Sequence, residues 1–268
     1  MSLGAQAQAT PQASAWCRRA RPVLGTLVEI GLPFAQAHHL PALWQVLDAV
    51  QAQMSAHATD SDLGRLHAAP VGQGVRVHPW TAEVLRLALA WQADSPVFDV
   101  ARGTGRWGLH ADDGAAVATR LDGDTRLDLG GLAKGWAVDR VVDTALALGV
   151  SALWVNAGGD LRTHGVALPI QLRVELQGGV QPWGLLEAGA LATSDFRPGA
   201  RATLWPGQAA RSPASPRHVS VMADLCATAD ALTKVVAATG LHDPHTRGLL
   251  SRHGAQAWGH DVGLCASP

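Results

Sequence analysis

The sequence lacks the features that mark several large classes of protein. Its three cysteines, Cys17, Cys226 and Cys265, lie far apart and form no CxxC pair, so we expect neither a disulfide framework nor a thiolate zinc site. The twelve histidines form no HExxH or similar spacing. A formal net charge of −1 argues against a protein that binds nucleic acid electrostatically. No run approaches the ~18 apolar residues of a membrane-spanning helix.

The N-terminal segment lacks the parts of a secretion signal. Before Arg18 it is small, polar and uncharged, without a basic start or an apolar centre. We expect residues 1–17 to form a disordered leader and residues 18–268 to form a single domain. The compartment stays open between the cytoplasm and, if a targeting segment has been trimmed, the periplasm or a membrane surface.

What is present predicts an α+β fold. Apolar residues make up 47% of the chain, and their spacing separates helices from strands. The predicted helices cover 40–57, 80–95, 134–148 and about 226–238. The predicted strands cover 23–32, the two halves of 151–165, and several short pieces between 166 and 222. We expect a loop ended by a short strand over 60–79, and a rigid turn region over 96–110. Strands and helices do not alternate regularly, which disfavours a doubly wound parallel sheet.

The stretch LDLGGLAKGWAVDR, residues 127–140, carries the clearest sign of chemistry. The glycine pair, Gly130 and Gly131, would let backbone N–H groups approach an anion at the start of a helix. Lys134 adds a charge suited to a phosphate, and Asp128 has a carboxylate for a ribose hydroxyl, an adenine amine or a metal-bound water. The pattern is neither GxGxxG nor GxxxxGK[ST]. A nucleotide-phosphate cradle and a plain strand–turn–helix joint therefore stay equally open.

Two further clusters have a simple structural explanation and a functional one. Gly158, Gly159 and Asp160 follow a strand and are typical of a type I′ or II′ hairpin turn. On the last predicted helix, Asp230 and Lys234 are i,i+4 neighbours, a spacing typical of a surface ion pair worth a few tenths of a kcal/mol. Apolar neighbours make that helix face less exposed, so a functional pair stays equally open there.

Together these stretches resemble the ApbE family, flavin transferases that move FMN from FAD onto a protein. Residues 127–165 follow the family's most specific segment nearly position by position. Five shorter stretches are also similar to it: RRARPVLGTLVEI, MSAHATDSDLGRLH, FDVARGTGRWG, LATSDFR and ADALTKVVAATG. The resemblance covers about 18–250 and is weakest between 166 and 220. It implies a T-fold-type arrangement of mixed or antiparallel sheets flanked by helices, in two interleaved subdomains with a flavin cleft between them.

The resemblance implies the reaction and its partners. FMN would pass from FAD to a threonine or serine hydroxyl of an acceptor flavoprotein, a redox subunit or domain that carries covalent FMN, and AMP would leave. Asp128 or Asp230 is implied as the carboxylate that orients or deprotonates the nucleophile. Contacts to FAD are implied at seven positions: Leu24, His57, Val97, Phe98, Asp99, Asp128 and Lys134.

The resemblance also implies Mg²⁺ near the FAD pyrophosphate. Its ligands would be the backbone carbonyl of Gly131, the carboxylate of Asp230 and a hydroxyl one turn later, for which Thr233 is the candidate. A hard cation prefers such oxygen ligands and neutralises a pyrophosphate as its P–O–P bond breaks. Lys234 stands where the family has its metal-binding threonine. Protonated lysine has no lone pair for Mg²⁺, but its ammonium could take the metal's place beside Asp230.

A second departure concerns the family's HxxDPxTG motif, which is missing before the last predicted helix. HDPHTRG at 242–248 imitates it but falls where the family has a loop, and His218 is the only histidine in the expected region. The departures leave three functions open. The chain is an active FAD:protein FMN transferase, an FAD pyrophosphatase in which water replaces the acceptor, or an FAD-binding protein without transfer activity.

Overall fold

The computed structural model describes residues 16–173, 179–196, 200, 218–260 and 265–266. Its largest sheet has eight strands in the order β1-β2-β6-β7-β10-β11-β12-β13, and every neighbouring pair is antiparallel. The strands are β1 (Trp16–Val23), β2 (Thr26–Pro33), β6 (Leu153–Ala157), β7 (Asp160–His164), β10 (Gly189–Asp195), β11 (His218–Ala223), β12 (Gln256–His260) and β13 (Cys265–Ala266).

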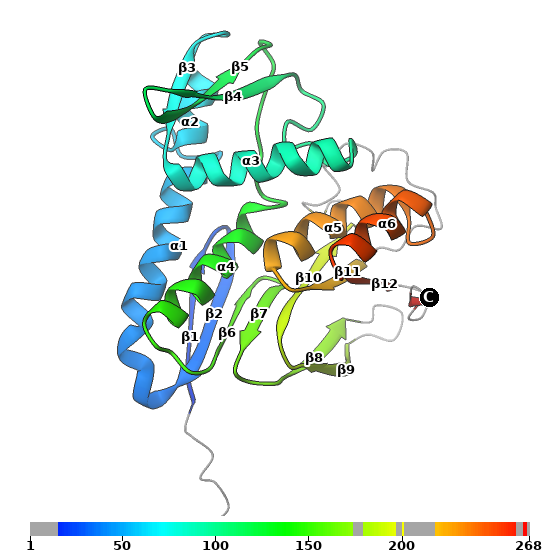
Figure 1. The fold of residues 1–268 in the computed structure, drawn as a ribbon. Coiled ribbons are helices and arrows are strands. Elements are labelled where there is room, and N and C mark those ends of the chain that lie inside the picture. The colour runs from blue at the N-terminus through cyan, green and yellow to red at the C-terminus, as the bar shows by residue number, and fades with distance from the viewer. Residues whose placement is uncertain (1–15, 174–178, 197–199, 201–217, 261–264, 267–268) are drawn as a thin grey trace, which may run out of the picture.

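Helices cover one face of this sheet (Figure 1). They are α1 (Leu40–Met54), α4 (Ala133–Ala147), α5 (Cys226–Thr239) and α6 (Pro244–Arg252), and a short 3-10 helix over Phe34–His39 precedes α1. α4 and α5 contact each other, α4 lies on β6 and β7, and α5 lies on β10 and β11. The apolar stripe predicted after Lys134 is buried in this layer, because Val138, Val141, Val142 and Ala145 are at most 1% exposed.

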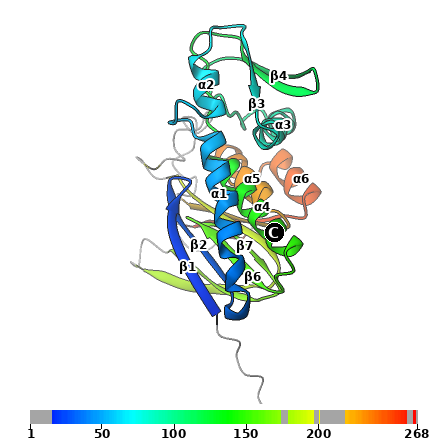
Figure 2. The ribbon, with the colours of Figure 1, turned by 90° about the vertical axis from the view of Figure 1, so that its left-hand side faces the viewer.

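A smaller part of the chain lies beyond the end of α1 (Figures 1 and 2). It holds a three-stranded sheet in the order β3-β5-β4 and two helices. These elements are α2 (Asp62–Ala68), β3 (Gly74–Val77), α3 (Pro79–Asp94), β4 (Trp107–Asp112) and β5 (Ala115–Arg120). The chain thus leaves the large sheet after β2 and rejoins it with α4. The α+β class with antiparallel sheets flanked by helices is therefore confirmed.

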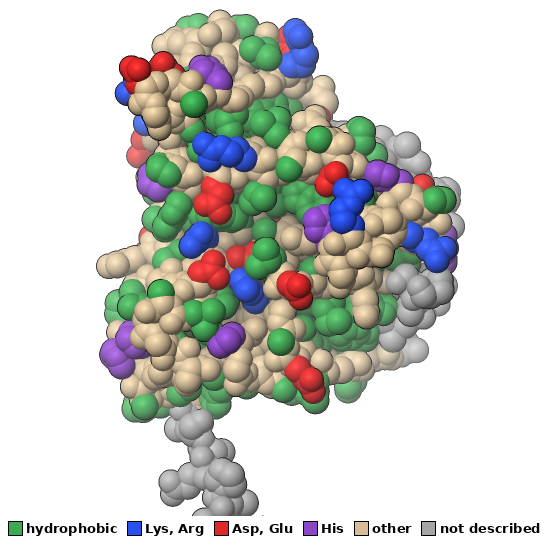
Figure 3. All heavy atoms as spheres, in the orientation of Figure 1, with side chains coloured by type: hydrophobic (Ala, Val, Ile, Leu, Met, Phe, Trp, Pro, Cys, Tyr) green, Lys and Arg blue, Asp and Glu red, His purple; other side chains and the backbone are tan. Residues whose placement is uncertain are grey.

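The opposite face of the large sheet carries a two-stranded hairpin, β8 (Leu168–Arg173) and β9 (Val180–Leu186). A separate apolar cluster joins it to β7 and β10 through Leu161, Ile170, Leu186 and Leu191. On the molecular face in Figure 3, basic and acidic side chains are scattered among each other rather than gathered by sign. Within the described ranges, no helix is both long enough and apolar enough to cross a bilayer.

At the N-terminal end, the expected strand over 23–32 is in fact two strands. Leu24 and Gly25 have φ angles of 56° and 70°, so the chain turns back between Val23 and Thr26, which face each other in the β1–β2 pair. The sheet already begins at Trp16, so the expected leader ends two residues too late. Its remaining residues, 1–15, lie outside the described ranges.

Two short helices replace expected loops. α2 lies inside the expected loop over 60–79; the Ser61 hydroxyl caps it by accepting a bond of 2.9 Å from the Gly64 N–H. α6 begins inside HDPHTRG, where the Asp243 carboxylate accepts a bond of 2.8 Å from the Thr246 N–H. Both helices are too short to show a clear apolar period. Only their N-cap residues, Ser61 and Asp243, could have predicted them from the sequence. The expected turn region over 96–110 likewise ends early, at the start of β4.

Candidate functional site

The start of α4 packs unusually close to the start of α5. A Cβ built on Gly135 would lie 2.5 Å from the Cys226 carbonyl oxygen, so only glycine allows this approach. One turn later, Asp139 accepts hydrogen bonds of 2.9 Å from the N–H groups of both Cys226 and Ala227, and Arg162 donates to it at 2.9 Å. Burial raises the pKa of Asp139. Gly135 and Asp139 therefore have a structural role: they lock the two helices together.

We predict that Gly135→Ala destabilises the protein by about 1–3 kcal/mol, the usual cost of overpacking a core. The added methyl group would meet backbone atoms of Cys226 and Ala227, which cannot rotate away as a side chain can. Gly248→Ala is the matched control, because this helical glycine has nothing within 4 Å of a built Cβ. Urea unfolding measures both. A Gly135→Ala protein as stable as the Gly248→Ala protein would contradict the close-packing argument.

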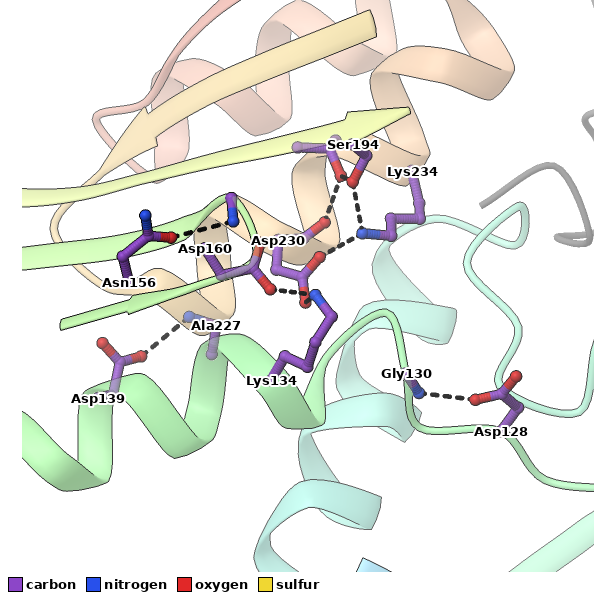
Figure 4. A network of polar contacts seen from close by, with 12 residues as sticks. Asp128, Gly130, Lys134, Asp139, Asn156, Asp160, Ser194, Ala227, Asp230 and Lys234 are labelled. Carbon is purple, nitrogen blue, oxygen red and sulfur yellow. Dashed lines mark hydrogen bonds and ion pairs between the residues drawn. The ribbon is translucent and has the colours of Figure 1, made fainter. Parts of the chain in front are cut away.

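Four charged side chains meet where α4 and α5 face the β6–β7 hairpin (Figure 4). The Lys134 ammonium donates to Asp160 Oδ2 and lies 3.9 Å from Asp230 Oδ2. The Lys234 ammonium donates to Asp230 Oδ1 and, at 2.8 Å, to the Ser194 hydroxyl. The side chains of Asp230, Asp160 and Lys234 are 0%, 1% and 6% exposed, but that of Lys134 is 28% exposed. Lys134 is thus the member of this charge network that solvent reaches most easily.

The network keeps Lys134 protonated. Burial alone would lower the pKa of Lys134, but the carboxylates of Asp160 and Asp230 outweigh it and raise that pKa. Burial would raise the pKa of Asp230, but Lys134 and Lys234 outweigh it and hold that pKa below its usual value. Burial and the neighbouring Asp230 carboxylate raise the pKa of Asp160. With all four groups ionised, two ammonium groups balance two carboxylates.

Asp128 lies apart from the charge network (Figure 4). Its carboxylate accepts bonds of 2.8 Å from the Gly130 N–H and 3.1 Å from Arg102. Its own N–H donates to the Val100 carbonyl at 2.8 Å, which places the 97–103 turn beside it. In that turn, the Asp99 carboxylate accepts bonds from two backbone N–H groups, at 2.8 and 2.7 Å. The structure thus brings two of the segments implied in FAD contact, the turn around Asp99 and the turn around Asp128, side by side.

The other implied FAD contacts differ in what they expose. Phe98 is 0% exposed, its ring packs near Trp91 and its N–H donates to the Ser95 carbonyl at 2.9 Å, so the whole residue is buried; Val97 beside it is half-buried. The Leu24 N–H donates at 2.7 Å to Gln51 Oε1 in the last turn of α1. His57 is exposed and follows the end of that helix, so Leu24 and His57 belong to one region.

The residues present do not fit the implied magnesium site. The Thr233 hydroxyl is buried, donates to the Asp230 carbonyl at 2.7 Å and shares a bond of 2.7 Å with Ser194. One oxygen of the Asp230 carboxylate is bonded to Lys234; the other has no hydrogen-bond partner among the described residues but has the Lys134 ammonium 3.9 Å away, and Gly131 is buried. Within the described ranges, no three His, Cys, Asp or Glu side chains are grouped to hold a metal. Mg²⁺ demands a near-octahedral shell of oxygens, which this arrangement does not offer.

Sequence reasoning missed Asp160 as a member of the charge network. The two-residue turn before it is as expected, because Gly158 and Gly159 have φ angles of 63° and 106°, both positive as a type I′ turn requires. The Asn156 side chain fixes the turn by accepting a bond of 3.1 Å from the Gly159 N–H. Asp160 then begins β7 with its carboxylate buried against Lys134. The Gly-Gly-Asp sequence of the turn predicts the hairpin but does not predict that the Asp160 carboxylate is buried.

His218 lies on the other side of the sheet from the network. Ser194, which bonds to Thr233 on α5, faces Val219 across the β10–β11 pair. Because successive side chains of a strand point to opposite faces, His218 points away from α5. Its Nε2 lies 3.6 Å from an oxygen of Asp195. The residues 201–217, where the missing family motif was expected, lie outside the described ranges.

Fold and site together define a class: an α+β protein with a lysine at a helix N-terminus, where N–H groups and positive charge favour an anionic ligand. The particular family follows from the sequence. The pattern of the ApbE family matches residues 24–256, so the chain belongs to the ApbE family. No curated protein sequence matches it significantly.

Solved structures agree in fold. The ApbE protein of Thermotoga maritima has a TM-score of 0.77 at 21% identity, with 94% of this chain and 97% of that one covered. The flavin transferase ApbE of Vibrio cholerae has a TM-score of 0.73 at 20% identity, covering 94% and 96%. The flavinyl transferase ApbE of Pseudomonas stutzeri has a TM-score of 0.72 at 19% identity, covering 94% of both chains. At such identities the likeness establishes the fold.

Proposed function

We propose that this chain transfers FMN from FAD to a hydroxyl of an acceptor flavoprotein. Membership of the ApbE family and the flavin-transferase names of two similar structures support this proposal. The observation that carries it is the position of Lys134: a protonated ammonium in the first turn of α4, held by Asp160 and Asp230 and still 28% exposed. A point charge fixed at a helix N-terminus suits a pyrophosphate.

In the proposed reaction, the acceptor's hydroxyl oxygen forms a bond to the FMN phosphorus. The bridging P–O bond of the pyrophosphate breaks, AMP leaves with the bonding electron pair, and the hydroxyl proton passes to a base. Asp128, with a side chain 38% exposed, is better placed for that proton than Asp230, which is fully buried and paired with Lys234. Lys134 and the N–H groups at the start of α4 would stabilise charge on the phosphates.

The remaining proposed contacts would hold the rest of FAD. Leu24 and His57 form one region at the end of α1, and Val97, Phe98 and Asp99 form the other beside Asp128. Phe98 is buried as a whole residue, so it would act by holding Val97 and Asp99 in position from the core. The resemblance implies Gly131, Asp230 and Thr233 as magnesium ligands, but the proposed step does not use them to bind a metal.

The test combines flavin binding with product analysis. FAD titration followed by flavin fluorescence should show binding, and mass spectrometry of co-expressed candidate acceptor domains should show an added FMN. AMP release from FAD without any acceptor would indicate a pyrophosphatase instead. Binding with neither product would indicate an FAD-binding protein without transfer activity. No binding even at ~1 mM FAD would contradict the proposal altogether.

We predict that Asp128→Ala weakens FAD binding or turnover by about tenfold or more, the order expected for loss of a charged hydrogen-bonding group. Asp122→Ala should change either by less than about twofold. The two carboxylates are closely matched: each side chain is 38% exposed, pairs with an arginine and accepts a backbone N–H. Fluorescence titration and AMP release measure both variants. Equal effects would mean that the Asp128 turn is only a structural joint.

A further inference from the structure

Lys234 stands one turn after Asp230, at the helix position where the family resemblance implies a metal-binding threonine. Its side chain is only 6% exposed, and its neighbours on α5, Leu232, Val235 and Val236, are fully buried. A buried ammonium is costly unless it is paired and hydrogen-bonded. Lys234 meets that requirement within the chain, through Asp230 and Ser194.

The four charges alternate along a connected path (Figure 4). Asp160 on β7 bonds to Lys134 on α4, whose ammonium lies 3.9 Å from one oxygen of Asp230. The other oxygen of Asp230 bonds to Lys234, which also donates to Ser194 on β10. One carboxylate oxygen of Asp230 is therefore bonded to an ammonium group, and the other, which has no hydrogen-bond partner in the part of the chain that the structure describes, has the second ammonium 3.9 Å away. A divalent cation beside Asp230 would lie between two positive charges, and their repulsion would oppose its binding.

The nearby hydroxyl of Thr233 is not available as a metal ligand. Thr233 bonds to Ser194 and to the helix backbone, so its oxygen is already committed. Ser194 in turn accepts from Lys234 at 2.8 Å. Around Asp230, the Thr233 and Ser194 hydroxyls and the carboxylate oxygen Oδ1 are thus bonded within the chain, while Oδ2 has no hydrogen-bond partner within the described ranges and has the Lys134 ammonium 3.9 Å away.

We propose that Lys234 permanently replaces the divalent cation at Asp230, so that this chain binds the FAD pyrophosphate through protein charges alone. The inference rests on the proposed FAD site. Lys234 holds the Asp230 carboxylate in place, and Asp230 and Asp160 together hold the Lys134 ammonium toward the ligand. A lysine is a point charge on a flexible stem, and it offers phosphate no metal-like octahedral geometry. FAD binding should therefore be independent of metal.

The first test uses the unmodified protein, with FAD affinity measured by flavin fluorescence in EDTA and in excess Mg²⁺. We expect the two dissociation constants to agree within about twofold. Calorimetric titration with Mg²⁺ alone should show no saturable heat. Binding that is about tenfold or more weaker in EDTA would overturn the inference but support the FAD site. Failure to bind FAD in either buffer would instead remove the proposed function on which the inference rests.

The second test uses Lys234→Thr, which frees the Asp230 carboxylate and adds a hydroxyl at the same helix position. We expect this variant to bind FAD about tenfold or more weakly in EDTA and to recover affinity in Mg²⁺. Arg247→Thr, an exposed substitution on α6, is the control and should behave as the unmodified protein. Equal dependence on Mg²⁺ in unmodified and Lys234→Thr proteins would show that Lys234 is a bystander ion pair. If Lys234→Thr does not fold, the measurements on unmodified protein decide by themselves.

Discussion

Lys134→Met is expected to destabilise the protein by about 3–5 kcal/mol, the cost of breaking a buried ion pair from one side, and to abolish FAD binding. Methionine keeps much of the length of lysine but has no charge. Asp160, 1% exposed, would lose its ammonium partner, and Asp230 would keep only Lys234. Burial already raises the pKa of Asp160, so the remaining carboxylate would take up a proton or admit water. Urea unfolding and flavin fluorescence measure the two effects.

A surface pair provides the control for Lys134→Met. Arg76 lies 3.9 Å from Asp112, with side chains 65% and 59% exposed, and Arg76→Met should cost less than about 1 kcal/mol. Adding Asp160→Asn to Lys134→Met removes the uncompensated charge, so it should restore part of the stability but none of the FAD binding. A cost for Lys134→Met no larger than that for Arg76→Met would show that the charge network does not stabilise the fold.

The parts of the fold that were predictable depend on local periodicity. α1, α3, α4 and α5 each carry apolar residues at helical spacing, and each helix was predicted within a few residues of its observed bounds. The β6–β7 hairpin was equally readable from its glycine pair. Longer motifs, spread over about 18–250, carried the family resemblance, which the family match over residues 24–256 confirms.

The burial of the site's charges was not predictable from the sequence. The i,i+4 spacing of Asp230 and Lys234 correctly predicts an ion pair, but the same spacing is found in exposed pairs, so it does not predict that this pair is buried. Their burial arises because α5 packs against β10, β11 and α4 at once. Asp160 reaches Lys134 only after the β6–β7 hairpin has paired, and Asp139 caps a helix 87 residues further along the chain. Such contacts depend on tertiary packing, and a local pattern of residues in the sequence does not contain that information.

His260 should make the protein lose stability in weak acid. It lies on β12, is 6% exposed, and its Nε2 shares a hydrogen bond of 2.8 Å with the Ser220 hydroxyl. Burial, together with the nearby His218, lowers the pKa of His260 from 6.5 to about 4. Between these values the unfolded chain binds more protons than the folded one. The free energy of unfolding therefore falls as the pH drops through that window, and this contribution is complete above pH 6.5.

The expected contribution of His260 is about 3 kcal/mol between pH 7 and 4, from a pKa shift of about 2.5 units at about 1.4 kcal/mol each. His260→Gln isolates it, because glutamine can still bond to Ser220 but does not titrate. Urea unfolding over this pH range should give a shallower loss for His260→Gln than for the unmodified protein. His164→Gln, at an exposed position in β7, should follow the unmodified protein. The carboxylates that titrate in the same range are common to all three proteins, so parallel curves for unmodified and His260→Gln proteins would show that His260 is protonated as readily in the folded state as in the unfolded one.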